Sequence, residues 1–406
     1  MQIADLALQR NKYKHLSDEE WQWFLQQEEG RLRTAEKLPS FAAVKDWWYP
    51  VRLSCEQCSS ELTARYKSER VKGLKGERVK GLKGERGRFV DLTGGYGVDT
   101  LFLSDCFDQT DYVEQDAELC RLMEHNSALA AKTISVHHAT AEEFLSSPLH
   151  SGSNGGFSLI YLDPARRDSH GGKVFRLEEC TPNVVELAPA LLEHLAPDGR
   201  ILLKLSPMLD ITQALKTLSV FHLQFSVHVV AVKNEVKELL FLSSPLNVPT
   251  NDNMANDQMV HCIDLSEPEK VFSFRRAEEE EEEAQSRMAE GSLSEGQYLY
   301  EPNAAVLKAG AYKLAGERFG LQKLAPNTHL YVSAEYVSEW PGRVWRIQSP
   351  ITHHPLPVTQ ANVLVRNYPL TAEQLKKKLH LRDGGALFVI GCRVGSKPTV
   401  FLCERV

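Results

Sequence analysis

A short glycine-rich segment constrains this chain of 406 residues more than any other feature. Residues 91–99 read Asp-Leu-Thr-Gly-Gly-Tyr-Gly-Val-Asp. An apolar strand over 88–92 leads into this segment, and a helix is expected from Asp99 to Cys106. Glycine lets the backbone approach a ligand where a Cβ atom would clash. A glycine loop at the carboxyl end of a first strand is where open α/β sheets bind ligands.

The charges of this loop discriminate between two classes of ligand. A dinucleotide brings a pyrophosphate, which favours backbone N–H groups at a helix N-terminus and is repelled by the carboxylates of Asp91 and Asp99. S-adenosylmethionine instead brings an ammonium and a sulfonium, which carboxylates attract. The spacing also departs from Gly-x-Gly-x-x-Gly, because Thr100 stands where the third glycine would. We therefore expect S-adenosylmethionine, in preference to a dinucleotide or to a structural turn without a ligand.

Further cofactor-binding residues are expected after the next two strands. Glu114 ends the second strand, where a carboxylate can accept hydrogen bonds from both ribose hydroxyls. Asp116 is the weaker candidate, and either acid could instead only stabilise the N-terminus of a helix. The third strand region, 136–144, is expected to supply the adenine pocket. The predicted cofactor-binding residues are Asp91, Thr93, Gly94, Gly95, Gly97, Asp99, Glu114, Thr140 and Ala141.

A second motif, Asp-Pro-Ala-Arg-Arg, follows the fourth strand at 163–167. A carboxylate here can orient an acceptor amine or take its proton, and methyl transfer otherwise needs mainly the positioning of two partners. We assign Asp163 and Pro164 to catalysis, and Arg166 and Arg167 to substrate phosphate because guanidinium groups are planar donor forks. The alternative is an Asp-Pro turn with solvated arginines. Lys204, in the fifth strand, either lines the pocket or extends along the sheet.

Strands and helices alternate over residues 88–246, which predicts an α/β fold with a parallel, Rossmann-like sheet and right-handed crossovers. Besides the first strand, the apolar runs predict strands over 112–114, 157–162 and 200–205, and helices over 117–131 and 211–218. Two β-rich runs, 224–232 and 235–242, are joined by Lys233-Asn234 and predict a terminal hairpin.

The region before this core is expected to have two parts. Residues 1–68 are predicted to be helical, with a helix start at Ser17. An aromatic cluster, Trp47, Trp48 and Tyr49, either packs against a neighbouring element or stacks on a base. Residues 69–87 contain ERVKGLKG twice in tandem and are interpreted as a basic loop, because recurrent glycine disfavours a helix.

The region after the core is expected to begin with a linker. Residues 247–296 are interpreted as a linker and acidic segment, because 247–260 are polar and rich in helix breakers. The six consecutive glutamates at 278–283 are interpreted as a solvated helix or disordered tract without function. Two small α/β modules are then predicted over 297–336 and 337–406. The second of them contains strands over 343–347, 362–366, 386–392 and 399–403 and a helix over 372–379, and the first contains strands over 298–300 and 329–332 and a helix over 304–319.

The charge distribution bears on the partner. The formal net charge is −7, which excludes a uniformly basic nucleic-acid binder. Two segments are nevertheless basic: residues 61–90 and residues 338–406 each hold ten Lys or Arg against four Asp or Glu. A basic end on an acidic chain points to nucleic acid, so RNA is the expected partner, with a merely solvated linker as the alternative for 61–90.

Other features limit location and metal chemistry. No apolar run approaches the ~18–20 residues needed to span a bilayer, and the first ten residues lack the pattern of a signal peptide. Cys55 and Cys58 form one close pair without the second pair that a zinc site needs. We therefore expect no membrane, no metal and a cytoplasmic protein with reduced thiols.

Several segments together resemble one protein family. The glycine loop, Glu114 and the 163–167 motif are similar to class I S-adenosylmethionine-dependent methyltransferases. Residues 53–64, 298–310 and 366–385 extend the likeness to a bacterial group with a helical N-terminal region, a Rossmann-like core, a ferredoxin-like domain and a C-terminal THUMP-like domain. The resemblance implies a cofactor held by the glycine loop and Glu114, with Asp163 at the reaction centre. THUMP domains are associated with RNA, mostly tRNA.

The resemblance therefore implies a methyltransferase acting on RNA, either tRNA or rRNA. The chain departs from the (Asp/Asn)-Pro-Pro-aromatic motif of enzymes that methylate exocyclic amines, because Ala165 and Arg166 follow Pro164. No aromatic ring is available at that position to stack on a base. Two alternatives stay open: a methyltransferase of a protein or small molecule whose C-terminal modules are docking domains, and an RNA-binding protein with a vestigial core.

Overall fold

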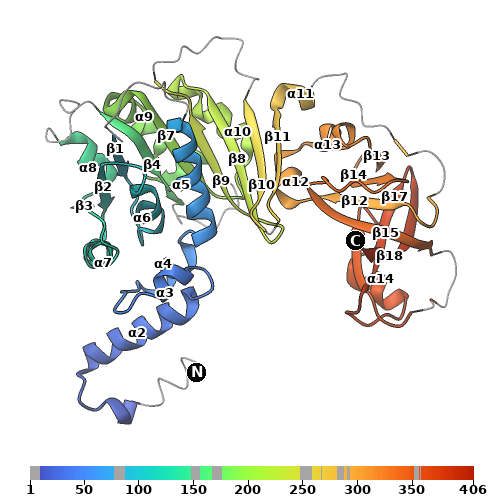
Figure 1. The fold of residues 1–406 in the computed structure, drawn as a ribbon, viewed down its shortest axis with the longest axis horizontal. Coiled ribbons are helices and arrows are strands. Elements are labelled where there is room, and N and C mark those ends of the chain that lie inside the picture. Colours follow the sequence, from blue (N-terminus) through green and yellow to red (C-terminus); the bar gives the residue numbers. More distant parts are fainter. Residues whose placement is uncertain are drawn as a thin grey trace. The chain divides into compact units, whose positions relative to one another are not determined.

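The computed structural model describes residues 10–76, 87–147, 156–166, 176–246, 258–266, 268–280, 288–289, 293–351, 356 and 358–406 (Figure 1). The chain folds into two compact units. The first comprises residues 1–225 and 240–250, and the second comprises residues 226–239 and 251–406. Two of the boundaries between the units, 225/226 and 239/240, fall in the segment predicted to form a hairpin, and the third, 250/251, follows it.

The N-terminal region is helical as predicted. Its elements are the 3₁₀-helix η1 (Arg10–Tyr13) and the α-helices α2 (Asp18–Thr34), α3 (Pro39–Ala42), α4 (Arg52–Gln57) and α5 (Glu61–Gly76). Helix α2 begins at the predicted cap. The Ser17 hydroxyl accepts from the Glu20 amide, and the Glu20 carboxylate accepts from the Ser17 amide. This reciprocal pair satisfies two of the otherwise unpaired donors at the helix N-terminus.

Helix α5 corrects the prediction of a loop over 69–87. Residues 69–76, the first copy of the repeat, are helical and continue α5. Val71 on this helix is buried, and α5 packs against the later helix α6 (Val98–Ser104). Such packing stabilises a helix enough to outweigh the ~1 kcal/mol that each glycine costs. Residues 77–86, with the second copy, lie outside the described residues.

The core of the first unit is a parallel sheet. Its strands are β1 (Arg88–Asp91), β2 (Gln109–Glu114), β3 (Ser135–His138), β4 (Phe157–Leu162) and β7 (Leu195–Leu205), in the order β7-β4-β1-β2-β3. All four neighbouring pairs are parallel. The chain order reverses between β1 and β4, and open α/β sheets bind ligands at such a switch point. The predicted α/β fold is confirmed.

Helices connect these strands. They are α6, α7 (Ala117–Leu129), α8 (Ala141–Ser146), α9 (Val184–His194) and α10 (Ile211–Leu218), with the 3₁₀-helices η2 (Leu177–Glu179) and η3 (Ser219–Phe221). Two short strands, β5 (Ala165–Arg166) and β6 (Cys180–Thr181), pair antiparallel in a separate small sheet. The predicted strand 157–162 and helix 211–218 are confirmed to the residue.

The predicted hairpin is also confirmed. Strands β8 (Phe225–Val232) and β9 (Glu235–Ser243) flank Lys233 and Asn234, whose φ angles are +52° and +60°. Two consecutive positive φ values are what a type I′ turn requires, and Asn tolerates that conformation better than most residues.

The linker predicted over 247–296 is wrong for its middle part. Residues there form β10 (Met259–Asp264), β11 (Lys270–Arg275) and α11 (Arg276–Glu280). Strand β10 runs parallel to β8 and antiparallel to β11, so the full order is β11-β10-β8-β9-β7-β4-β1-β2-β3. Alternate residues are buried, such as Val260 and Cys262, and Phe272 and Phe274. This alternation of buried and more exposed residues is typical of strands. The neighbouring helix-breaking residues nevertheless favoured the prediction of a linker.

The glutamate run is not simply solvated either. Within the described part of the run, Glu279 accepts hydrogen bonds from the backbone amides of Tyr312, Lys313 and Leu314 at 2.8–3.0 Å. These amides belong to the first turn of α13 (Tyr312–Arg318), where a carboxylate also complements the helix dipole. Glu279 thus has a structural role, and residues 281–283 lie outside the described chain.

The second unit contains a seven-stranded sheet among its described residues. The strands are β12 (Tyr298–Pro302), β13 (Gln322–Ala325), β14 (Thr328–Ser333), β15 (Gly342–Pro350), β16 (Asn362–Arg366), β17 (Leu387–Val394) and β18 (Lys397–Arg405), in the order β13-β14-β12-β15-β18-β17-β16. Helices α12 (Ala304–Ala309), α13 and α14 (Ala372–Lys378) accompany them. The single helix predicted over 304–319 is divided because Gly310, at φ +79°, caps α12.

Candidate active site

Two of the three glycines in the glycine loop are packed closely against other side chains. A Cβ atom on Gly94 would lie 2.2 Å from Cε2 of Tyr112, and one on Gly97 would lie 2.1 Å from Cε of Met123. Gly95 differs, because a Cβ there would meet nothing closer than a backbone oxygen at 3.7 Å, although its φ of +55° still favours glycine. The open side of the loop is therefore at Gly95, which is where a ligand can approach the backbone.

Asp91 holds the loop from inside the protein. Its carboxylate accepts hydrogen bonds from the Thr93 amide at 3.0 Å and the Thr100 hydroxyl at 2.5 Å. Only 1% of Asp91 is exposed. Burial raises the pKa of Asp91 to about 7, even though these two hydrogen bonds lower it. The carboxylate predicted to bind the cofactor thus stabilises the loop that would bind it.

Glu114 lies beside the open glycine. One carboxylate oxygen accepts from the Gly95 amide at 2.8 Å, and the other accepts from the Asp116 amide at 2.9 Å. Each carboxylate oxygen has a second lone pair, so this half-buried side chain can still accept two hydroxyl donors. Asp116 instead caps α7, where it accepts from the amides of Glu118 and Leu119.

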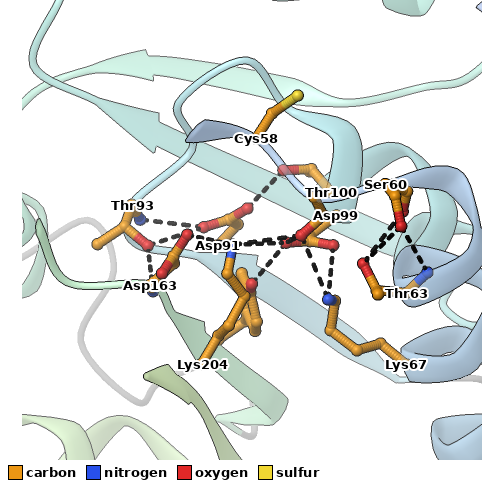
Figure 2. A network of polar contacts seen from close by, with 12 residues as sticks. Cys58, Ser60, Thr63, Lys67, Asp91, Thr93, Asp99, Thr100, Asp163 and Lys204 are labelled. Carbon is orange, nitrogen blue, oxygen red and sulfur yellow. Dashed lines mark hydrogen bonds and ion pairs between the residues drawn. The ribbon is translucent and has the colours of Figure 1, made fainter. Parts of the chain in front are cut away.

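Asp99 is engaged inside the protein rather than exposed to a ligand (Figure 2). One carboxylate oxygen lies 3.2 Å from the Lys67 ammonium. The other accepts from the hydroxyls of Ser59 at 2.7 Å and Tyr161 at 2.6 Å. Burial raises the pKa of Asp99, but the ammonium groups of Lys67 and Lys204 lower it more, and the net shift is downward.

Asp163 stands across the switch point from the glycine loop, directly after β4. Its backbone amide donates to the Thr93 hydroxyl at 2.6 Å, which ties the two loops together. Its carboxylate forms an ion pair with Lys204 at 2.5 Å. The Asp163 side chain is 37% exposed, whereas Pro164 is buried. The Lys204 ammonium, predicted either to line the pocket or to extend along the sheet, therefore lies beside Asp163.

The remaining predicted site residues are Thr140, Ala141, Arg166 and Arg167. Thr140 caps α8 through a reciprocal pair with Glu143, in which the Thr140 amide donates to the carboxylate. Ala141, the first residue of α8, is buried. Arg167 and the side chain of Arg166 lie outside the described parts of the chain, so their predicted phosphate contacts stay predictions.

Sequence reasoning missed several contributors to this site. Ser59 and Lys67 come from the N-terminal region, and Tyr161 comes from β4. The one available signal was that Ser59 falls within the 53–64 segment on which the family resemblance partly rests. The aromatic cluster nearby packs: the Trp47 indole donates to the Tyr96 hydroxyl at 2.9 Å.

The described residues contain neither a metal-binding cluster nor a membrane-spanning helix. No group of three or more His, Cys, Asp or Glu side chains there is arranged to hold a metal ion. Nor does that part of the chain contain a helix both long and apolar enough to cross a membrane.

Comparison with solved structures identifies the family. The chain is 33% identical to a candidate methyltransferase from Porphyromonas gingivalis W83, over 96% of this chain and 92% of that chain, with a TM-score of 0.80. This chain belongs to that methyltransferase family. In the methyltransferase, residues 298–341 match the model of a ferredoxin-like domain and residues 342–405 match a THUMP domain-like model. The predicted family is confirmed.

More distant solved structures match about half of this chain. The methyltransferase is 14% identical to a ribosomal protein L11 methylase from Lactobacillus delbrueckii subsp. bulgaricus, over 44% of this chain and 79% of that chain, with a TM-score of 0.31. It is 19% identical to a Thermus thermophilus 16S rRNA N2 G1207 methyltransferase in complex with AdoMet and guanosine, over 50% of this chain and 45% of that chain, with a TM-score of 0.33. Neither likeness bears on the acceptor. A comparison with curated proteins gave no match.

Proposed function

We propose that this methyltransferase takes its methyl group from S-adenosylmethionine and transfers it to RNA, with Asp163 positioning the acceptor. The observation that carries the proposal is the pairing of an open glycine loop with a half-exposed carboxylate across the switch point. The Thr93 hydroxyl joins the two, because it accepts from the Asp163 amide. Both halves of a transfer site are thus held within one hydrogen-bonded unit.

The residues of the loop suit this cofactor. Glu114 keeps free lone pairs beside Gly95, which suits two ribose hydroxyls, and the absence of a side chain at Gly95 leaves room for a ligand. Thr140 and Ala141, at the end of β3, would adjoin the adenine. When bound, the cofactor supplies an electrophilic methyl group on a sulfonium. Asp91 and Asp99, whose carboxylates are engaged by the protein, act by holding the loop and the start of α6.

Asp163 would act on the acceptor. Its exposed carboxylate can accept a hydrogen bond from an N–H of the incoming amine and so turn the nitrogen lone pair toward the cofactor. The ion pair with Lys204 fixes the direction of this carboxylate. Positioning of this kind supplies much of the rate of a two-partner transfer, because it removes the entropy of alignment.

Two features support RNA as the acceptor. Residues 342–405 match a THUMP domain-like model, and this stretch exposes basic side chains at Lys377, Lys378, Arg382 and Lys397. Contacts between such groups and phosphates release counterions, so RNA affinity should fall steeply with salt.

All eight cysteines are free thiols, which suits a reducing compartment, and we include a cytoplasmic location in the proposal.

The test is transfer of a labelled methyl group from S-adenosylmethionine to RNA and protein fractions of cells that lack this gene. Wild type and an exposed control on α8, Glu142→Gln, should label RNA equally. Asp163→Asn should reduce labelling by at least about 100-fold, the range for a positioned acid or base, while cofactor affinity measured by calorimetry stays unchanged.

Other outcomes would refute parts of the proposal. Label in protein alone would assign the second unit to partner docking. This result has a specific motivation, since Arg166 stands where a base-stacking ring would be expected. Absence of cofactor binding by the wild type would refute the cofactor and the reaction together.

A further inference from the structure

Two buried or nearly buried lysines and two aspartates form a cluster at the site, which we call the charge quartet: Lys67, Asp99, Lys204 and Asp163 (Figure 2). They come from four elements, namely α5, α6, β7 and the segment after β4. The exposed fractions of their side chains rise from 0% for Lys67 through 9% and 12% to 37% for Asp163. The quartet therefore extends from the protein interior, at Lys67, to the partly exposed Asp163, which we propose positions the acceptor.

The distances show how the charges are shared. The Lys204 ammonium lies 2.5 Å from Asp163 but 3.6 Å from Asp99. Lys67 lies 3.2 Å from the other oxygen of Asp99. Each aspartate of the quartet therefore has a different lysine as its nearer cation, although Lys204 also lies within ion-pair distance of Asp99. The Ser59 hydroxyl joins the two halves, because it lies 3.3 Å from Lys67 and 3.2 Å from Lys204.

We propose that Lys67 is a positioning residue for the reaction: it neutralises Asp99 and thereby leaves Lys204 to orient Asp163. Without Lys67, the buried carboxylate of Asp99 would be the stronger attraction for Lys204, because ion pairs are strongest where water is excluded. The Lys204 nitrogen lies 3.6 Å from the Asp99 carboxylate. A movement of only about an ångström would bring it within hydrogen-bond distance of that carboxylate. The N-terminal helix α5 is thus part of the reaction centre.

The other charged and titratable groups around the quartet do not replace Lys67. The Tyr161 hydroxyl donates a hydrogen bond to Asp99 but carries no positive charge. Asp91, on β1, adds only a carboxylate, and its described partners are the neutral groups of Thr93 and Thr100. Within the described chain, Lys67 and Lys204 are the two cations whose ion pairs with Asp99 are recorded.

The test compares a single and a double variant. Lys67→Gln removes one positive charge and leaves Lys204 shared between two aspartates. Lys67→Gln with Asp99→Asn removes a whole ion pair, so Asp163 is the one aspartate of the quartet that Lys204 still faces, and two side-chain amides keep polar groups in contact. Lys216→Gln, an exposed lysine on α10, is the control for the loss of one positive charge.

The expected result is a loss that the second substitution reverses. Lys67→Gln should lower kcat between about 10- and 100-fold, as misplacement by about an ångström does, with the KM for cofactor unchanged. The double variant should recover to within about threefold of the wild type. In a Lys204→Gln background, Lys67→Gln should lower kcat no further. A purely structural role predicts that the double variant is at least as impaired as the single one, and that result would overturn the proposal.

The role in methyl transfer rests on the proposed function, so a second measurement is independent of activity. Crystal structures of Lys67→Gln and of the double variant report the position of the Lys204 nitrogen. We expect it at hydrogen-bond distance from Asp99, about 3 Å, in the single variant, compared with 3.6 Å in the wild type, and back on Asp163 in the double variant. A nitrogen that stays on Asp163 in both would refute the inference even if the wild type methylates nothing, whereas a shift with an inactive wild type would refute only the proposed function.

Discussion

Asp91 gives the sharpest prediction of pH dependence, because a fully buried carboxylate there has only uncharged donors as its described partners. Burial raises its pKa from 3.8 to about 7. The folded state therefore binds a proton that the unfolded chain releases, and the associated stability is complete below pH ~4 and is lost as the pH rises to about 7. A shift of about three units corresponds to roughly 4 kcal/mol at 1.36 kcal/mol per unit.

The variant that isolates this effect is Asp91→Asn, which keeps the shape, can accept from the Thr93 amide and donate to the Thr100 hydroxyl oxygen, but cannot ionise. Urea unfolding without cofactor at intervals from pH 4 to pH 8 should show the wild type losing stability relative to the variant, by about 4 kcal/mol over the whole range. Asp99, whose pKa is lowered, contributes with the opposite sign below pH ~4 and cancels in the comparison. Glu142→Gln should parallel the wild type. If Asp91→Asn also parallels it, then Asp91 ionises in the folded protein as easily as in the unfolded chain and the reasoning is wrong.

Four further substitutions test the packing and the buried polar contacts. Gly94→Ala should destabilise the first unit by about 1–3 kcal/mol in thermal unfolding, because its Cβ meets the fixed ring of Tyr112 at 2.2 Å, whereas Gly95→Ala should cost only about 1 kcal/mol for its positive φ. Glu301→Gln should destabilise the second unit by up to about 3 kcal/mol, the lower end for breaking a buried pair, because Glu301 is 2% exposed and binds two partly exposed arginines; an unchanged midpoint would contradict this. Glu279→Ala should increase amide hydrogen exchange in the first turn of α13 and leave α14 unaffected.

Much of the fold could be predicted because the signals are local. A few neighbouring residues are enough to predict the conformation of each of three segments: the glycine loop, the strand over 157–162 and the Lys233-Asn234 turn. The predicted strand over 362–366 likewise coincides with β16. Where tertiary packing decides the outcome, local reasoning failed: the glycines of 69–76 indicate a loop, yet α5 continues through them because it packs on α6.

The candidate site was only partly predictable for the same reason. Positions at the ends of strands, such as Glu114 and Asp163, follow from the α/β pattern alone. The function of a carboxylate depends on what the fold places beside it. Asp91 and Asp99 look alike in the sequence, but one is surrounded by neutral donors and the other by two ammonium groups. Lys67 is 32 residues from Asp99 in the chain, and no local pattern links them.

The place where the chain divides has a consequence for inheritance. A domain joined end to end can be acquired or lost in one recombination event. Here residues 226–239 belong to the second unit although residues 240–250 return to the first, and β8 pairs with β10 within that second unit. A gene truncated after residue 246 would therefore encode a β8 lacking its neighbour, and an uncovered apolar edge promotes aggregation. Because the segments of the two units alternate along the chain, no single break in the gene separates one unit intact from the other.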